Sequence, residues 1–124
     1  AAEVIADEIV NKGYRYVVVL RGDEAVGYIA YRYDASDAAV LISKLYLLPA
    51  LHGKGIGRRM LQHVKDDAVR CGAKRVYLFV NKNNRKAIDA YERFGFRKAE
   101  AVVTDIDSGF VMDDYRMELD VDRR

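Results

Sequence analysis

Hydrophobic positions along the chain recur in two periods, and each period predicts a different kind of element. Segments that alternate apolar and polar positions and are rich in β-branched and aromatic residues are expected to be strands. The first three of these are joined by short turns, which favours an antiparallel meander, and the last two flank the turn sequence DSG as a hairpin. The predicted strands are 14–20, 25–33, 38–48, 74–80, 97–106 and 110–121.

Three other segments repeat their hydrophobic residues at helical spacing, and we expect helices at 3–11, 56–71 and 83–96. Gly72 can adopt the left-handed C-cap conformation after the second helix, and Asn84 can cap the start of the third. The first helix rests on four apolar residues: Val4, Ile5, Ile9 and Val10.

The order of these elements predicts the class of fold. A strand, crossover helix and strand in succession place 38–48 and 74–80 parallel to each other, whereas the earlier strands are antiparallel. We therefore expect an α+β fold with a mixed, mostly antiparallel sheet flanked by helices. The 51% hydrophobic fraction suffices for one core, so residues 1–124 are expected to form a single domain.

The charge balance and the cysteine content indicate which cellular compartment and which classes of binding partner to expect. With 21 basic and 19 acidic residues the net charge is +2, too balanced to bind nucleic acid through an overall field. No segment is apolar enough to span a membrane, and the start AAEVIADEIV is too acidic for a secretion signal. Cys71, the one cysteine, cannot form an intramolecular disulfide. A cytoplasmic protein without a nucleic-acid or membrane partner is expected.

The stretch LLPALHGKGIGRRM, at 47–60, joins a predicted strand to a predicted helix. Main-chain N–H groups at a helix start lack helical partners and attract anions, and glycines let an anion approach closely. A tight turn with solvated basic residues is the alternative reading. Walker and dinucleotide motifs do not fit, because no hydroxyl follows Lys54 and Met60 occupies the third small position. Arg58 and Arg59 fall in the first turn, where they oppose the helix dipole. The stretch thus combines three glycines with a cluster of three basic residues: Gly53, Gly55, Gly57, Lys54, Arg58 and Arg59.

Two blocks of this chain resemble the GNAT-type N-acetyltransferases. The segment LYLLPALHGKGIG is similar to the acetyl-CoA-binding signature, a glutamine or arginine followed by x, x, Gly, x, Gly or Ala. The segment NNRKAIDAYERFGF resembles the family's other block. The order and separation of the two blocks agree, and the resemblance covers roughly residues 3–121. The matching positions are Gly55, Ile56 and Gly57 in the first block, and Asn84, Ala87, Tyr91, Gly95 and Phe96 in the second.

The resemblance implies an acyl-CoA N-acyltransferase fold whose fourth and fifth strands splay apart, with the pantetheine arm of acetyl-CoA between them. It implies an enzyme that moves the acetyl group of acetyl-CoA directly to a primary amine of a small molecule or peptide, without a metal. Main-chain groups would hold the arm and the pyrophosphate, and Asn84 would hold the arm from the opposite side. The implied acetyl-CoA contacts are Leu45, Tyr46, Leu47, His52, Gly53, Lys54, Gly55, Ile56, Gly57, Arg58 and Asn84.

The chain departs from the family pattern in three places. His52 stands where glutamine or arginine is usual, and Phe79 aligns with the glutamate that serves some members as general base. The family's first strand and helix are not apparent ahead of 3–11. The last two departures keep open an alternative function, a CoA-binding sensor or scaffold of the same fold without catalysis.

The resemblance assigns Tyr91 the role of general acid, although its helical position also suits a core tyrosine. Asn84 is by default an N-cap. Acidic residues around the last hairpin border the family's acceptor site and would attract an amine, or they form a solvated surface. Of these residues, Asp105, Asp107, Asp113 and Asp114, we single out the last two as substrate-binding candidates. A second chain could fill an open sheet edge at 14–20 and form a homodimer.

Overall fold

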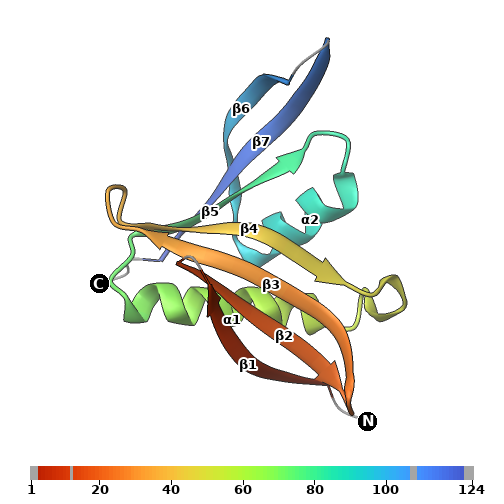
Figure 1. The fold of residues 1–124 in the computed structure, drawn as a ribbon. Coiled ribbons are helices and arrows are strands. Elements are labelled where there is room, and N and C mark those ends of the chain that lie inside the picture. The colour runs from red at the N-terminus through yellow and green to blue at the C-terminus, as the bar shows by residue number, and fades with distance from the viewer. Residues whose placement is uncertain (1–2, 12, 107–108, 122–124) are drawn as a thin grey trace.

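The computed structural model describes residues 3–11, 13–106 and 109–121, and their strands form one sheet (Figure 1). Within the described residues the strand order is β1-β2-β3-β4-β5-β7-β6, with β4 and β5 parallel and the other neighbours antiparallel. The prediction of a mixed, mostly antiparallel sheet is therefore confirmed. The elements are β1 (Glu3–Asn11), β2 (Tyr14–Arg21), β3 (Glu24–Asp34), β4 (Ala39–Leu47), the 3₁₀-helix η1 (Pro49–Leu51), α1 (Ile56–Arg70), β5 (Arg75–Asn81), α2 (Arg85–Phe94), β6 (Arg97–Ile106) and β7 (Phe110–Asp120).

The helix expected at 3–11 is wrong, because this segment is strand β1 and pairs antiparallel with β2. The register shifts between Ala6 and Glu8, which leaves Asp7 as an extra residue. Such a bulge interrupts the alternation of a strand, so its apolar residues fall at a spacing that resembles a helical one. The expectation of an open sheet edge at 14–20 is also wrong, because β1 pairs with β2 along that edge.

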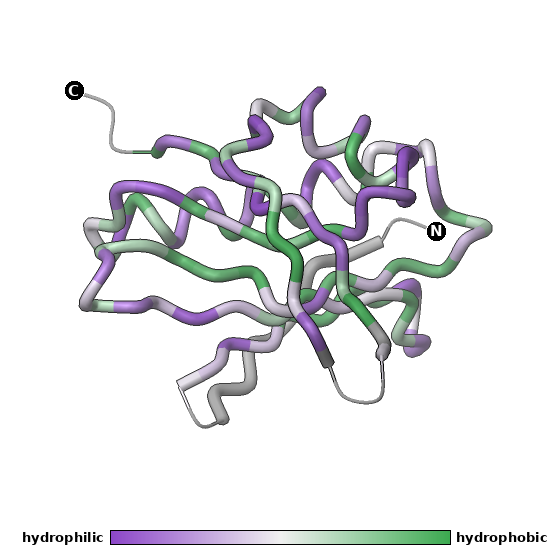
Figure 2. The backbone as a smooth tube through the Cα atoms, turned by 90° about the horizontal axis from the view of Figure 1, so that it is seen from above, coloured by the Kyte–Doolittle hydropathy of each residue, from purple (hydrophilic) through white to green (hydrophobic). Residues whose placement is uncertain are grey.

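One hydrophobic core lies between the sheet and the two helices. Seen from above, α1 and α2 lie on the same side of the sheet (Figure 2). The buried face of α1 is the one that the sequence predicts, and Ile88 of α2 belongs to the same cluster as the inward-facing strand residues. Neither helix is long and apolar enough to cross a membrane in the part of the chain described. The buried residues of α1 are Ile56, Met60, Leu61, Val64 and Ala68.

Neither helix covers the opposite face of the sheet, which carries exposed aromatic residues. Tyr28 and Tyr46 are cross-strand partners on β3 and β4, and their ring centroids lie 6.1 Å apart. Tyr28, Tyr46 and Phe79 are 37%, 46% and 47% exposed, whereas their neighbours along each strand are mainly buried. The alternation of exposed and buried residues is that of a sheet with one packed face.

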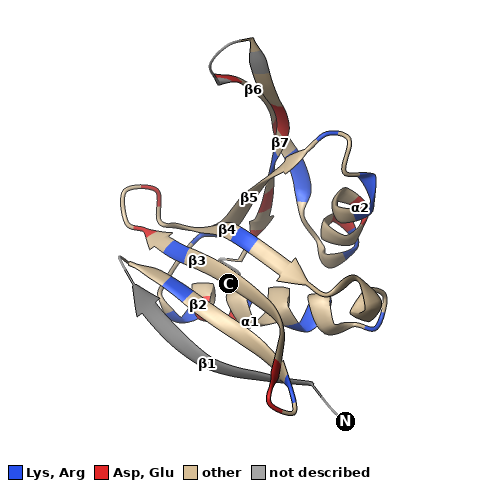
Figure 3. Ribbon diagram, turned by 45° about the vertical axis from the view of Figure 1, so that its right-hand side comes forward, with Lys and Arg blue, Asp and Glu red and all other residues tan. Residues whose placement is uncertain are grey.

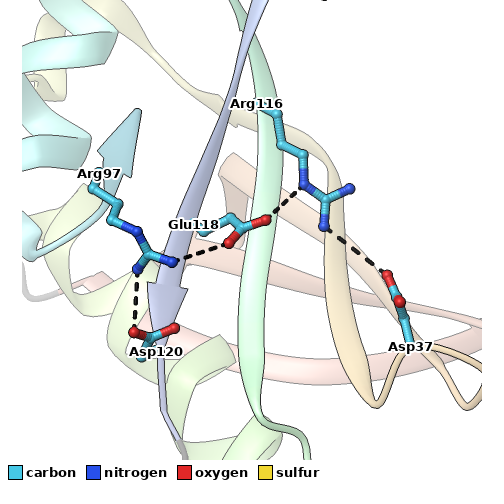
Figure 4. Close-up of polar contacts among 5 residues, drawn as sticks. All are labelled: Asp37, Arg97, Arg116, Glu118 and Asp120. Carbon is cyan, nitrogen blue, oxygen red and sulfur yellow. Dashed lines mark hydrogen bonds and ion pairs between the residues drawn. The ribbon is translucent and has the colours of Figure 1, made fainter. Parts of the chain in front are cut away.

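A chain of ion pairs ties the amino-terminal end of β4 to the far side of the sheet (Figure 4). Arg97 contacts Asp120 at 3.2 Å and Glu118 at 3.1 Å. Glu118 also accepts a 2.8 Å hydrogen bond from Arg116, whose guanidinium lies 4.0 Å from Asp37 in the turn before β4. These contacts cross β6, β7 and the β3–β4 turn, so they help to hold the sheet together where β4 and β5 are paired.

Candidate functional site

The parallel strands β4 and β5 pair for only part of their length. Their register covers Ala39 with Arg75, Val40 with Val76 and Leu41 with Tyr77, and no pair follows beyond these. The two strands then run apart toward their carboxyl ends (Figure 1). Main-chain groups along the diverging edges lack a strand partner there. The splayed strands that the family resemblance implies are therefore present.

A bulge in β4 accompanies this divergence. The pairing with β3 passes from Tyr31 opposite Ile42 to Ala30 opposite Lys44, which leaves Ser43 as the extra residue. The Ser43 hydroxyl donates a 3.3 Å hydrogen bond to the Ala30 carbonyl. Because a bulge bends its strand and increases the local twist, it helps to turn the carboxyl half of β4 away from β5.

The glycine loop, residues 52–57, connects the end of β4 and η1 to α1. Gly53 and Gly55 have φ angles of +78° and +82°, a region that other residues adopt only with strain. Gly55 is also the N-cap of α1, and no side chain caps this helix start. The first N–H groups of α1 are therefore left without a side-chain acceptor, the arrangement that binds anions.

Gly57 differs from the other glycines of the loop. It has no positive φ, and a Cβ added there would meet nothing within 4 Å. Neither the backbone conformation nor packing requires a glycine at this second position of α1. A glycine within a helix costs about 0.5–1 kcal/mol relative to alanine. This cost is explained if the exposed main chain serves a ligand.

Basic residues gather at the starts of both helices (Figure 3). Arg58 and Arg59 lie in the first turn of α1, Arg85 and Lys86 lie in that of α2, and neither first turn contains an acid. The Arg58 guanidinium carbon lies 5.3 Å from the centre of the Phe94 ring at the end of α2. The cations oppose both helix dipoles, so a bound anion would relieve their repulsion.

His52 makes contacts with both of its ring nitrogens. Nε2 lies 2.9 Å from the Leu47 carbonyl oxygen, and Nδ1 lies 3.2 Å from Nζ of Lys86. The neighbouring Leu48 N–H donates to the Val26 carbonyl at 2.9 Å, so the Leu47–Leu48 peptide is held on both sides. Lys86 is not among the residues predicted from the sequence. It carries the same local signal as Arg58, a basic residue in a helical first turn that contains no acid.

The second block forms α2 as predicted. Asn84 is the N-cap, and its side-chain oxygen accepts a 3.2 Å hydrogen bond from the Ala87 N–H. Tyr91 is half-buried against the core, with its ring centroid 5.7 Å from that of Phe96. Burial raises the pKa of the Tyr91 hydroxyl, which strengthens its hold on the proton at neutral pH.

The remaining residues expected at the acetyl-CoA site differ in exposure. The side chains of Leu47 and Ile56 are buried in the core, so any ligand contact of theirs must come from the main chain. Leu45 is half-buried, and the Tyr46 side chain is on the uncovered face of the sheet. Lys54 is exposed in the glycine loop.

The acidic residues of the last hairpin separate into distinct environments. Asp113 forms a 2.7 Å ion pair with Lys82, whose pKa is raised by this hydrogen bond. Asp114 is 8% exposed, and among the described residues it is the one charged residue that is buried. Asp105 is exposed, and Asp107 lies outside the described residues. No group of three His, Cys, Asp or Glu residues within the described ranges is placed to hold a metal ion.

Comparison with known proteins identifies one family. The model of the acetyltransferase (GNAT) family matches residues 2–96, which contain the glycine loop and α2. Streptothricin acetyltransferase from Streptomyces lavendulae is 36% identical over 81 residues, 65% of this chain and 43% of that protein. Spermine/spermidine N(1)-acetyltransferase from Bacillus subtilis is 35% identical over 71 residues, 54% of this chain and 45% of that protein.

A solved structure shares the same fold. The crystal structure of nourseothricin acetyltransferase superposes with a TM-score of 0.79 and 22% sequence identity, over 89% of this chain and 66% of that chain. The chain spans about half the length of the curated relatives that it matches.

Proposed function

The chain belongs to the acetyltransferase (GNAT) family, and from this premise we propose that it transfers the acetyl group of acetyl-CoA to a primary amine. The transfer would be direct, within a ternary complex of the two substrates. The acceptor would be a small-molecule amine or the amino group of a peptide.

The observation that carries this proposal is Gly57. All nine glycines of the chain are described, and seven of them have a positive φ. At Gly27 an added Cβ would lie 2.8 Å from the Tyr46 carbonyl oxygen. Gly57 alone has neither reason, so its unobstructed main chain is best explained by close approach of a phosphate group.

The residues present fit the parts of acetyl-CoA. The glycine loop and the uncapped start of α1 would hold the pyrophosphate, and the diverging edges of β4 and β5 would hydrogen-bond the pantetheine arm near 45–47. The Asn84 side-chain oxygen is engaged as the N-cap, which leaves its NH₂ group to donate to the arm. Asn84 can therefore act in both of its expected roles.

The reaction requires an acid for the departing thiolate and a donor for the developing oxyanion. Tyr91 would give its hydroxyl proton to the sulfur as the new N–C bond forms and the C–S bond breaks. A main-chain N–H near Leu47 would donate to the carbonyl oxygen. Phe79 supplies no base, so water relayed to a carboxylate would take the proton of the amine.

Acceptor recognition would fall to Asp114 rather than Asp113. Asp113 is already paired with Lys82, whereas the Asp114 side chain makes no direct hydrogen bond or ion pair within the described part of the chain and interacts with the charge of Lys82 only at longer range. An incoming ammonium group would give the Asp114 carboxylate a direct charged partner. The Bacillus subtilis relative is named for spermine and spermidine, which are cationic amines.

Binding and turnover test the proposal separately. Isothermal titration is expected to show 1:1 binding of acetyl-CoA, and a panel of polyamines, aminoglycosides, amino acids and peptides should release CoA thiol with at least one acceptor. Binding without thiol release across the panel would instead support a CoA-binding sensor or scaffold, and absence of any CoA binding would exclude both functions.

The acceptor role of Asp114 has a matched control in its neighbour. With an active amine, Asp114→Asn is expected to raise KM for that amine about tenfold or more, because a charged partner is lost. Asp113→Asn removes the same charge from an ion pair that is more than half exposed on the aspartate side. An equal rise in KM for both variants would argue for a general field effect and against a specific contact of Asp114.

A further inference from the structure

The two sequence blocks of the site are joined through one imidazole. A carbonyl oxygen can only accept a hydrogen bond, so the Nε2 of His52 that faces Leu47 must carry a proton. An ammonium group can only donate, so the Nδ1 that faces Lys86 must carry a lone pair. Both contacts are made as hydrogen bonds by the imidazole tautomer with its proton on Nε2. In this tautomer His52 holds the Lys86 ammonium group beside the glycine loop.

The cation that His52 orients is placed beside the glycine loop. Lys86 belongs to the first turn of α2, yet its Nζ lies 3.2 Å from a residue that directly precedes Gly53. Within the described residues Lys86 makes no ion pair, and neither helix has an acid in its first turn. The ammonium group of Lys86, in contact with the first residue of the glycine loop, therefore lacks an anionic partner within the described residues.

We propose that Lys86 binds a phosphate group of CoA and that His52 is its positioning residue. This inference rests on the proposed function, since it assigns a ligand to the same site. The family signature usually has glutamine or arginine at the position of His52. Here the positive charge comes from α2 instead, and His52 links it to the Leu47–Leu48 peptide at the end of β4.

The role of Lys86 is tested by titration with three ligands: CoA, 3′-dephospho-CoA and a phosphate-free acetylpantetheine thioester. Lys86→Met is expected to weaken CoA binding about tenfold or more and to make it less dependent on salt, because one charged contact is lost. Lys86→Arg should retain most of the affinity. Lys65→Met, which removes the same charge from the middle of α1, should change affinity less than twofold. Circular dichroism melts establish that each variant is folded.

The ligand set identifies the phosphate. If Lys86→Met weakens CoA but not 3′-dephospho-CoA, Lys86 contacts the 3′-phosphate, and if both are weakened it contacts the pyrophosphate. Undiminished CoA binding by folded Lys86→Met, or an equal loss for the phosphate-free thioester, overturns the assignment. Failure of the unmodified protein to bind CoA would overturn the proposed function as well, so the two failures are distinguishable.

A double-mutant cycle tests the positioning role of His52. His52→Ala is expected to weaken CoA binding about threefold to tenfold in the unmodified protein, and to have little further effect when Lys86→Met is already present. A merely structural His52 would give the same loss in both backgrounds. Such additivity would remove His52 from the positioning role, even if Lys86 proved to bind phosphate.

Discussion

The two helices of this chain begin in opposite ways. At the start of α2 the Asn84 side chain accepts a hydrogen bond from a first-turn N–H, whereas the start of α1 has Gly55 as N-cap and no side-chain acceptor. Both first turns carry basic residues and contain no acid. The helix dipole and the basic residues that oppose it are thus similar at the two helix starts. The difference lies in whether a side chain accepts a hydrogen bond from the first N–H groups.

This difference separates folding from binding. The start of α2 is satisfied within the chain, so α2 is a fixed support from which Tyr91 and Lys86 project. The start of α1 is completed by a ligand under the proposed function, and Gly57 keeps the approach to it open. We therefore expect changes at the start of α1 and at Lys86 to alter CoA binding first, whereas changes at Asn84 and Tyr91 of the α2 block should alter stability and catalysis first.

The largest effect is expected from Gly57→Glu. A carboxylate at this position would occupy the space beside the first turn of α1 and repel phosphate, so binding of acetyl-CoA should fall by more than about 100-fold. The fold should persist, because an added Cβ meets nothing within 4 Å. Isothermal titration measures the affinity, and circular dichroism measures the melting temperature.

Gly109→Glu is the matched control for this change, since it adds the same side chain at the β6–β7 turn, where an added Cβ also meets nothing within 4 Å. The positive φ of Gly109 makes it the more strained site, so any loss of stability should be greater there. Equal CoA affinity of Gly57→Glu and the unmodified protein would contradict a binding role for the start of α1.

Tyr91→Phe is expected to have the next largest effect, and on the opposite property. Removal of a general acid should lower kcat by about 10²-fold or more, whereas the ring and its contact with Phe96 remain. The affinity for acetyl-CoA should change little. Steady-state kinetics with an active amine, beside titration of the variant, measure the two quantities. Unchanged turnover would identify Tyr91 as a core tyrosine only.

The regular part of the fold could be predicted from the sequence because its periods are uninterrupted. The buried face of α1 and the parallel pairing of β4 with β5 follow from spacing and from the order of elements. Segment 3–11 could not be predicted in this way, because one bulge residue, Asp7, displaces the alternation. Its partner β2 is the next strand along the chain, with Asn11 opposite Tyr14, so the interrupted alternation and not the distance along the chain concealed the strand.

The candidate site shows the same limit. The glycine loop and Asn84 were predicted because their motifs are local, but Lys86 acquires its place only when α2 packs beside the loop. Likewise, adjacent positions in β7 gave no reason to separate Asp113 from Asp114. A strand points successive side chains to opposite faces, and their partners come from other strands.

Asn84→Ala removes the side-chain cap at the start of α2 and should act mainly on stability. Loss of the N-cap is expected to lower the free energy of unfolding by about 1 kcal/mol, because the Ala87 N–H loses its acceptor. CoA affinity should fall only a few-fold, through the arm contact proposed for the amide. Chemical denaturation measures the first quantity and titration the second. A large loss of affinity at unchanged stability would reverse the roles assigned to the two helix starts.

Gly57→Ala is expected to have the smallest effect and the opposite sign. Position 57 has helical backbone angles and open space around its Cβ, so alanine should raise the free energy of unfolding by about 0.5–1 kcal/mol. The added methyl group should at the same time weaken CoA binding, because it lies where a phosphate would approach the main chain. Stability and affinity thus move in opposite directions at the uncapped start of α1, whereas both fall in Asn84→Ala at the capped start of α2. If alanine stabilised the protein and left CoA affinity intact, the glycine would have no binding role, and the uncapped start of α1 would be only a turn.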